Sequence, residues 1–205
     1  RQQPPNGDAR FKHTSSNGHA PRWRLGQLWL GDAASAYFLS GRYNWGMKNS
    51  TSSPMPVWRS LLYVPINVER FVQKAHTRGA DVVQLDLEDS VPPSEKARAR
   101  TLVESVAPRV RVAGADVVVR INRPLSLAVR DIEHSVVEGV DALAVTKVAV
   151  AAHIALLDEL VAELELSRGL EPGKIRFIVM IETAQAFMQI NEIIGASPRI
   201  VAANI

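Results

Sequence analysis

From residue 59 onward, short apolar runs alternate with stretches in which apolar residues recur every three or four positions. The runs are rich in Val and Ile and nearly continuous in hydrophobicity, which is typical of strands that are buried on both faces. They predict six strands, over residues 61–65, 81–88, 116–122, 142–148, 176–183 and 199–205. The stretches between them predict five helices, over residues 67–78, 94–106, 130–138, 151–167 and 184–194.

Two of these helices carry further expectations. The helix over 94–106 is expected to end before Pro108, because a proline disfavours helical geometry at the residue that precedes it. The helix over 151–167 is expected to be strongly amphipathic, with an apolar stripe from Ile154 to Leu164.

Strands that alternate with helices indicate an α/β fold with a parallel sheet. Both an open doubly wound sheet and a (β/α)₈ TIM barrel have this pattern. Polar side chains at the ends of several different strands favour the barrel, whose catalytic face is built in this way. Those side chains are Asp86, Glu88, Asp89, Arg120, Asn122, Lys147 and Glu182. A full barrel takes about 250 residues, so we predict a TIM barrel truncated after about the sixth strand.

Residues 1–58 differ in composition from the rest. They are rich in Pro, Gly, Asn and Ser, and carry seven basic and two acidic residues, against 17 basic and 19 acidic residues over 59–205. We expect a disordered or poorly structured basic leader over 1–58 and a partial TIM-barrel domain over 59–205. The body shows no basic face with interleaved aromatic residues, so nucleic acid is not an expected partner. The chain begins at Arg1 and stops inside an apolar run, and we expect it to be a fragment.

The absence of cysteine excludes disulfide scaffolds, thiol nucleophiles and Cys-ligated zinc. It favours an intracellular protein. We expect a cytoplasmic location, and the Arg- and Ser-rich leader leaves a mitochondrial one open. No apolar run approaches the roughly 18 residues of a membrane span, so no membrane partner is expected. The five histidines are isolated from one another, and we expect ordinary surface positions on helices for them.

Three acidic residues lie close together at the end of the second predicted strand. Asp86 and Glu88 stand at positions i and i+2 of one strand face, and Asp89 follows. Carboxylates this close need a cation, a base or a helix N-terminus to remain ionised together. They either line a functional pocket or cap the next turn and pair with bases of the following helix. Those alternative partners are Lys96, Arg98 and Arg100.

Arg120 and Glu182 each follow an apolar strand. A guanidinium in such a dry setting needs a planar anion, and a carboxylate matches it in a bidentate geometry. Arg120 therefore either binds a substrate carboxylate or forms a structural ion pair with a neighbouring acid. A metal ion would offset the desolvation cost of Glu182. The alternative for Glu182 is an internal pair with Arg120 or Lys147.

Several segments also fall in the order and spacing of one known family. They are residues 59–65 (RSLLYVP), 79–81 (GAD), 85–93 (LDLEDSVPP), 95–96 (EK), 99–100 (AR), 119–122 (VRIN), 146–148 (TKV) and 181–184 (IETA). Residues 59–205 thereby resemble the HpcH/HpaI aldolase and citrate lyase beta-subunit family. The LEDSV stretch is the most specific piece, and it is similar to the branch that acts on acyl-CoA thioesters.

The resemblance implies a TIM barrel that uses Mg²⁺ for carbon–carbon cleavage of a 3-hydroxyacyl-CoA, of the citryl-, malyl- or citramalyl-CoA type. It implies that Arg120 binds the carboxylate of the keto-acid half and that Glu182 coordinates the metal. Glu88 and Asp89 would line the same substrate pocket, and a second metal-binding aspartate is expected beyond Ile205. A homo-oligomer, trimer or hexamer, is expected for the full-length protein.

Two positions depart from the family pattern. Ile66 stands where a glycine is usual, in the first loop, and Thr146 replaces a proline before Lys147.

Two other functions remain open. One is an aldolase for free 2-keto-3-deoxy sugar acids, and the other is a non-catalytic subunit or remnant that serves assembly. The fragment itself is expected to be inactive, because one protein carboxylate would hold Mg²⁺ weakly.

Overall fold

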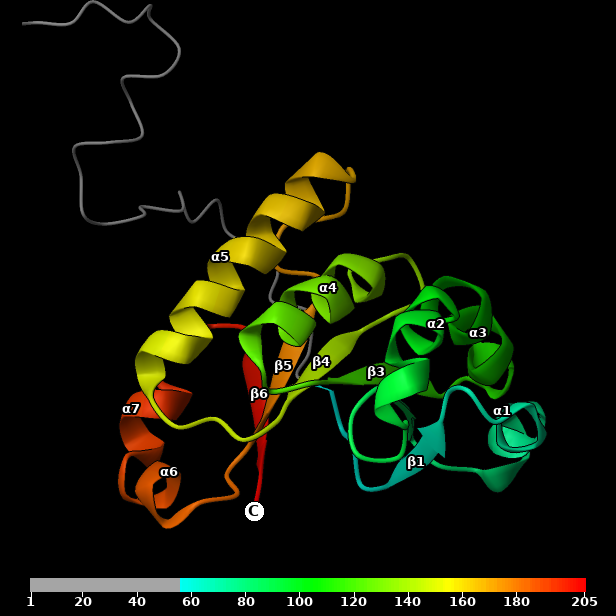
Figure 1. The fold of residues 1–205 in the computed structure, drawn as a ribbon, viewed down its shortest axis with the longest axis horizontal. Coiled ribbons are helices and arrows are strands. Elements are labelled where there is room, and N and C mark those ends of the chain that lie inside the picture. Colours follow the sequence, from blue (N-terminus) through cyan, green and yellow to red (C-terminus); the bar gives the residue numbers. More distant parts are fainter. Residues whose placement is uncertain (1–55) are drawn as a thin grey trace, which may run out of the picture. The chain divides into compact units, whose positions relative to one another are not determined.

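The structure is a computed structural model that describes residues 56–205. The basic leader expected over 1–58 lies outside the described residues, apart from its last three. In the described part, six strands alternate with helices, as the sequence pattern predicts (Figure 1). The strands are β1 (Leu61–Pro65), β2 (Val82–Asp86), β3 (Asp116–Ile121), β4 (Ala142–Val145), β5 (Arg176–Met180) and β6 (Ile200–Asn204).

Seven α-helices and three short 3₁₀ helices connect and follow these strands within residues 56–205. The α-helices are α1 (Glu69–Ala75), α2 (Lys96–Thr101), α3 (Val103–Val110), α4 (Leu125–Ser135), α5 (Ala151–Ser167), α6 (Ala184–Met188) and α7 (Ile190–Ile194). The 3₁₀ helices are η1 (His76–Arg78), η2 (Pro93–Glu95) and η3 (Arg111–Ala113). No helix among residues 56–205 has the length and apolar character needed to cross a membrane.

Three of the predicted helices differ from the structure. The prediction that helix 94–106 ends before Pro108 is wrong, because α3 contains Pro108 and runs to Val110. Burial of Val106, Ala107 and Val110 holds this segment helical past the proline. The helix predicted over 184–194 is divided at Gln189 into α6 and α7.

The helix predicted over 130–138 begins five residues earlier, as α4, and ends at Ser135. Its start follows Pro124, whose carbonyl accepts hydrogen bonds from the main-chain N–H groups of Leu127 and Ala128 at 2.8 and 2.9 Å. A fixed proline φ just before the first turn favours that geometry.

Helix α5 has the predicted bounds, but apolar and charged residues are divided less clearly between its buried and exposed faces than expected. Ile154, Leu157 and Val161 are buried as the apolar stripe predicts. Glu165 is also buried, whereas Leu166 is 77% exposed. The expectation of a strongly amphipathic helix is therefore wrong, because ion pairing of Glu165 brings a charge into the helix–sheet layer.

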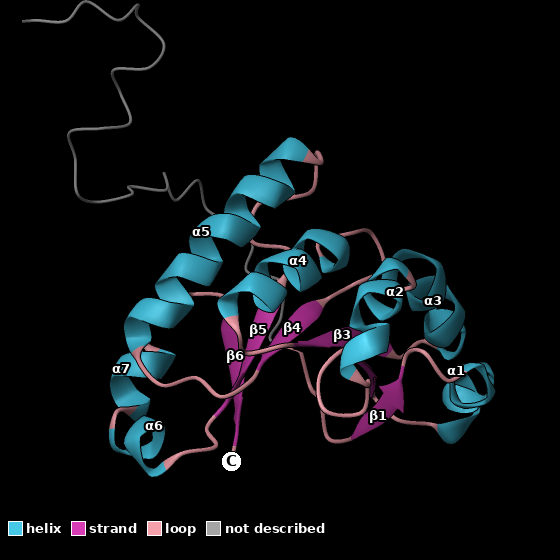
Figure 2. Ribbon diagram, in the orientation of Figure 1, coloured by secondary structure: helices cyan, strands magenta, loops and turns pink. Residues whose placement is uncertain are grey.

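The sheet has the order β1-β2-β3-β4-β5-β6, and every neighbouring pair is parallel. A doubly wound sheet would reverse this order at a switch point. Here the crossover helices form an arc around one face of the sheet, as Figure 2 shows. Since all strands run in the same direction, their carboxyl ends meet at one edge, and Asp86 lies in register with Arg120.

Apolar side chains fill both faces of the sheet. The larger cluster lies between the sheet and the helices and includes Leu85, Val119 and Phe177. The smaller cluster, on the other face, includes Val118 and Ile178. On that inner face the two edge strands approach each other, because Asn204 Nδ2 in β6 donates to the Tyr63 hydroxyl in β1 at 3.4 Å. The sheet is therefore curved, and its inner face is concave.

Candidate functional site

Charged residues gather where the strands end, and we call Asp86, Glu88, Asp89, Arg120, Lys147 and Glu182 the carboxyl-end site. Its centre is an ion pair between the neighbouring strands β2 and β3. Arg120 in β3 donates from Nε and Nη2 to the two carboxylate oxygens of Asp86, the last residue of β2, at 2.8 and 2.6 Å. The main-chain N–H groups of Glu88 and Ser90 also donate to Asp86, at 2.8 and 3.1 Å. Burial raises the pKa of Asp86, but the hydrogen bonds from Arg120, Ser90 and Glu88 outweigh it and hold the pKa below its usual value.

The rest of the Arg120 guanidinium faces the other two acids. Its Nη1 lies 3.2 Å from Glu88 Oε2 and 3.9 Å from Asp89 Oδ2. The guanidinium also lies over the Tyr63 ring, 5.4 Å from its centroid, where a cation–π attraction helps to hold it. Asp86 thus occupies one bidentate edge of Arg120, and Glu88 and Asp89 face Nη1, so a substrate carboxylate that binds Nη1 would have to displace these acids.

Lys147, just after β4, forms the second cation of the site. Its Nζ donates to Glu88 Oε1 at 2.6 Å and lies 3.4 Å from Asp89 Oδ1. The hydrogen bond to Glu88 raises the pKa of Lys147, outweighing the opposing effect of burial. The Glu88 side chain is 5% exposed, and its Oε2 has no hydrogen-bond partner among residues 56–205. The acids at the end of β2 therefore pair with bases at the ends of β3 and β4.

The alternative in which these acids pair with bases of the following helix is wrong. Lys96 Nζ donates instead to the main-chain carbonyls of Leu87 and Glu88, at 3.0 and 2.8 Å. Arg100 binds the buried Asp131 with a 2.9 Å hydrogen bond. Arg98 lies 3.9 Å from Glu95.

Glu182, shortly after β5, joins the site through the main chain of Lys147. Its Oε2 accepts a hydrogen bond of 2.6 Å from the Lys147 N–H. Neither expected side-chain pair is present, because no ion pair joins Glu182 to Arg120 or to the Lys147 ammonium within the described residues. Glu182 and Arg120 nevertheless stand at the same edge of the sheet, connected through Lys147 and Glu88.

The carboxyl-end site offers limited ligands to a metal ion. No group of three metal-ligating side chains comes together within residues 56–205. Asp86, Glu88 and Asp89 are engaged with Arg120 and Lys147. Glu182 has a carboxylate oxygen, Oε1, that no hydrogen bond of the described residues engages. Mg²⁺ is commonly held by one or two carboxylates together with water and substrate oxygens, so Glu182 fits as one ligand of such an ion.

A cavity of about 490 Å³ opens beside the carboxyl-end site, and Glu88, Asp89, Asn122, Arg123 and Lys147 contribute to its walls. Arg123 Nε donates to the Lys147 carbonyl at 3.0 Å, which fixes the guanidinium between two strand-end loops. Lys96 also lines this cavity. Three cationic and two anionic side chains thus surround a space large enough for a small anionic molecule.

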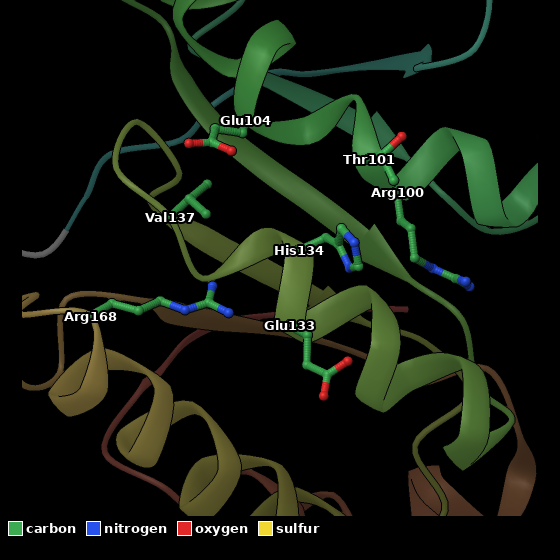
Figure 3. A pocket seen from close by; sticks show the side chains of 7 residues that line it. All are labelled: Arg100, Thr101, Glu104, Glu133, His134, Val137 and Arg168. Atoms are coloured by element: carbon green, nitrogen blue, oxygen red, sulfur yellow. The ribbon is translucent and has the colours of Figure 1, made fainter.

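A second cavity, of about 470 Å³, lies among the helices (Figure 3). Its walls come from α2, α3, α4 and the residues after α4 and α5, and they mix acids with bases, such as Glu104, Glu133 and Arg168. It contains none of the strand-end residues, so the cavity at the strand ends is the candidate substrate site.

Sequence reasoning missed two features of this site and misplaced one histidine. Tyr63 was not singled out, although alternation along β1 places it on the inner face with Leu61. The sequence indicates Lys147 as a polar strand end and as a possible side-chain partner of Glu182, but its main-chain role has no sequence signal. His153 in α5 is 9% exposed and both its ring nitrogens lack partners in the described part, so the expected surface position is wrong for this histidine.

Residues 59–205 match the family described as HpcH/HpaI aldolase/citrate lyase. The chain belongs to this family. Its relatives include the citrate lyase subunit beta of Leuconostoc mesenteroides subsp. cremoris, 33% identical over 144 residues that cover 70% of this chain and 48% of that protein. The L-malyl-CoA/beta-methylmalyl-CoA lyase of Rhodobacter capsulatus is 31% identical over 165 residues, which cover 78% of this chain and 52% of that protein.

Solved structures support the same fold for this HpcH/HpaI family member. RipC from Yersinia pestis superposes with a TM-score of 0.50 at 28% identity, over 71% of this chain and 56% of that one. The malate synthase of Haloferax volcanii in its magnesium/glyoxylate complex superposes with a TM-score of 0.64 at 18% identity, over 72% of this chain and 51% of that one. The chain spans about half the length of the relatives named here.

Proposed function

We propose that this chain belongs to a Mg²⁺-dependent lyase that cleaves a 3-hydroxyacyl-CoA, of the citryl-, malyl- or citramalyl-CoA type, into an acyl-CoA and a keto acid. The membership of the family and the likeness to a citrate lyase beta subunit and a malyl-CoA lyase support it. The observation that carries the proposal is the position of Arg120 and Glu182 at one sheet edge, connected through Glu88 and Lys147.

We also propose that the six strands are the first six of a (β/α)₈ barrel. Sequential parallel order, a concave inner face and helices on one side support that architecture. For the whole protein we propose a homo-oligomer, a trimer or a hexamer, to be tested by light scattering.

The reaction divides the substrate at the bond between the hydroxyl-bearing carbon and the carbon next to the thioester. The hydroxyl loses its proton and becomes the carbonyl of the keto acid, while the bond electrons pass to the acyl-CoA half as an enolate that takes up a proton. Arg120 Nη1 would bind the keto-acid carboxylate and orient this bond. Glu88 and Asp89 would line the pocket, with Lys147 balancing their charge.

Magnesium bound through Glu182 would supply a Lewis acid at the oxygen whose charge changes. The described residues contribute one carboxylate to that ion, so the substrate's own oxygens would complete much of its coordination. Asp86 would keep Arg120 in one orientation, because its two oxygens bind the guanidinium edge opposite to the proposed substrate side.

The test compares acyl-CoA thioesters with free hydroxy-keto acids. The full-length protein is incubated with Mg²⁺ and malyl-, citramalyl- or citryl-CoA, and the released keto acid is trapped as its phenylhydrazone. Thioester cleavage that is lost in Glu182→Gln supports the proposal. Cleavage of free 2-keto-3-deoxy acids alone would instead indicate an aldolase. A defined oligomer without Mg²⁺ binding or turnover would indicate an assembly subunit, and either result would overturn the proposal.

A further inference from the structure

Lys147 has an unusual main-chain conformation. Its φ is 49°, and it is the one residue other than glycine with positive φ among residues 56–205. Side chains with a Cβ rarely adopt this left-handed region, and asparagine, aspartate and glycine adopt it most readily. Such an outlier persists only where the surrounding contacts determine it, and it is often found at functional sites.

Contacts with four other residues hold Lys147 in this conformation. Its N–H donates to Glu182 Oε2 at 2.6 Å, and its carbonyl accepts from Arg123 Nε at 3.0 Å. Its ammonium binds Glu88 at 2.6 Å and lies 3.4 Å from Asp89. The preceding residue, Thr146, is fixed as well, because its Oγ1 donates to the Ile121 carbonyl at 3.0 Å.

We infer that Lys147 is a positioning residue for Glu182. The left-handed turn directs the Lys147 N–H at one oxygen of the Glu182 carboxylate and leaves the other oxygen for a divalent cation. The ammonium, held by Glu88 and Asp89, keeps the turn in place. Metal-ligating carboxylates are commonly oriented by such hydrogen bonds, and loss of the orienting partner typically weakens metal affinity about 10- to 100-fold. This inference rests on the proposed function, which assigns the cation to Glu182.

The inference predicts an unusual order of substitutions at position 147. Lys147→Ala removes the ammonium but keeps a Cβ, so the main chain relaxes out of the left-handed region and Glu182 loses its hydrogen bond. Lys147→Gly and Lys147→Asn also remove the ammonium, but both residues tolerate the left-handed turn. Glycine and asparagine should therefore preserve cation binding better than alanine does. A role confined to the ammonium would make the three variants equal.

The experiment measures Mn²⁺ binding to the full-length protein through the relaxation of water protons, which detects weak sites without any turnover. Mn²⁺ stands in for Mg²⁺ because both prefer octahedral oxygen ligands. We expect Lys147→Ala to weaken binding about 10- to 100-fold, and the glycine and asparagine variants to stay within about threefold of the unmodified chain. Lys174→Ala is the matched control, because Lys174 also pairs with an acid, Glu138, but lies outside the carboxyl-end site.

Glu182→Gln separates the inference from the proposed function. If this variant binds Mn²⁺ as well as the unmodified chain, or if the unmodified chain binds none, the metal role of Glu182 fails and the inference falls with it. If Glu182→Gln abolishes binding while the three Lys147 variants weaken it equally, the metal role stands and the positioning role is wrong. Binding that follows the order glycine, asparagine, then alanine supports both.

Discussion

The two ends of the parallel sheet both carry charged side chains, but these are bonded differently. At the amino ends, Glu165 is fully buried, and each of its oxygens accepts one hydrogen bond from Arg199 and one from a main-chain N–H. At the carboxyl ends, Glu88 is nearly as buried, but its Oε2 has an ion pair with Arg120 Nη1 at 3.2 Å and no hydrogen bond in the described part. Glu182 uses one of its two oxygens.

This difference separates a stabilising network from a binding network. Buried polar groups are normally satisfied by hydrogen bonds, and a fully satisfied set such as that of Glu165 fixes neighbouring elements against each other. An acid such as Glu182, which uses one oxygen and binds the main chain of Lys147 at the cavity wall, leaves an oxygen for a ligand. The amino ends therefore serve the fold, and the carboxyl ends carry the proposed function.

The largest expected effect is on stability, from breaking the amino-end network. Arg199→Ala leaves Glu165 buried and unpaired, and removal of one partner from such a pair costs about 3–5 kcal/mol in the free energy of unfolding. Urea denaturation measures it. The double variant Glu165→Leu/Arg199→Met should recover much of the loss, because no unpaired charge remains. An unchanged midpoint for Arg199→Ala would remove the distinction between the two ends.

The next effect concerns binding at the carboxyl ends. Arg120→Ala should weaken keto-acid affinity about 10- to 100-fold, since a hydrogen bond to a charged group contributes about 1.5–3 kcal/mol. Calorimetric titration with pyruvate, glyoxylate and oxaloacetate in the presence of Mg²⁺ measures it. Arg120→Lys keeps the charge but loses the bidentate pair with Asp86, and should bind with intermediate affinity. Retained affinity in Arg120→Ala would show that this arginine is structural, like Arg199.

A smaller effect depends on pH. Burial, aided by the nearby Arg123, lowers the pKa of His153 from its usual value of 6.5. The unfolded chain therefore protonates His153 at a higher pH than the folded protein does. The contribution of neutral His153 to stability is complete above about pH 6.5 and falls as the pH drops below that value. Asp86, whose pKa is also lowered, loses its contribution only at more acidic pH, below its usual value of 3.8.

His153→Leu should remove the loss of stability between about pH 7 and pH 5. Urea midpoints at the two pH values measure it, and His134→Leu is the control, because that histidine on α4 is only half-buried and its Nδ1 lies 2.8 Å from the Arg130 carbonyl. An equal pH dependence in the unmodified chain and in His153→Leu would contradict the assignment.

The smallest effect comes from an exposed pair near the amino ends. Lys174 binds Glu138 at 2.5 Å, but the Glu138 side chain is 78% exposed, and solvent screens such pairs. Lys174→Ala should leave the urea midpoint within experimental error. A clear loss would mean that burial does not decide which amino-end pairs stabilise the fold.

The sequence was sufficient to predict the strands and the edge of the sheet that gathers the charged residues. Buried parallel strands read as continuous apolar runs, so all six were found, and polar residues just past those runs fall at one edge. The helices were harder. Pro108 lies inside α3, and α4 begins at Leu125, because packing and the geometry around Pro124 outweigh local preference.

The partners within the site could not be predicted in the same way. A sequence shows that Arg120 and three acids end neighbouring strands, but register decides that Asp86 faces Arg120. The hydrogen bond between Glu182 and the main chain of Lys147 depends on one left-handed residue. Lysine has no preference for that conformation, so no sequence pattern predicts it.

The sequential strand order has a consequence for how the chain acquires its fold. Each strand pairs with the strands that precede and follow it along the chain, so every strand pairing joins segments separated by a single crossover. During synthesis, each new strand therefore emerges after the preceding strand with which it pairs. The contact between Tyr63 and Asn204 joins the first and sixth strands, so it forms only after the sixth strand has been made.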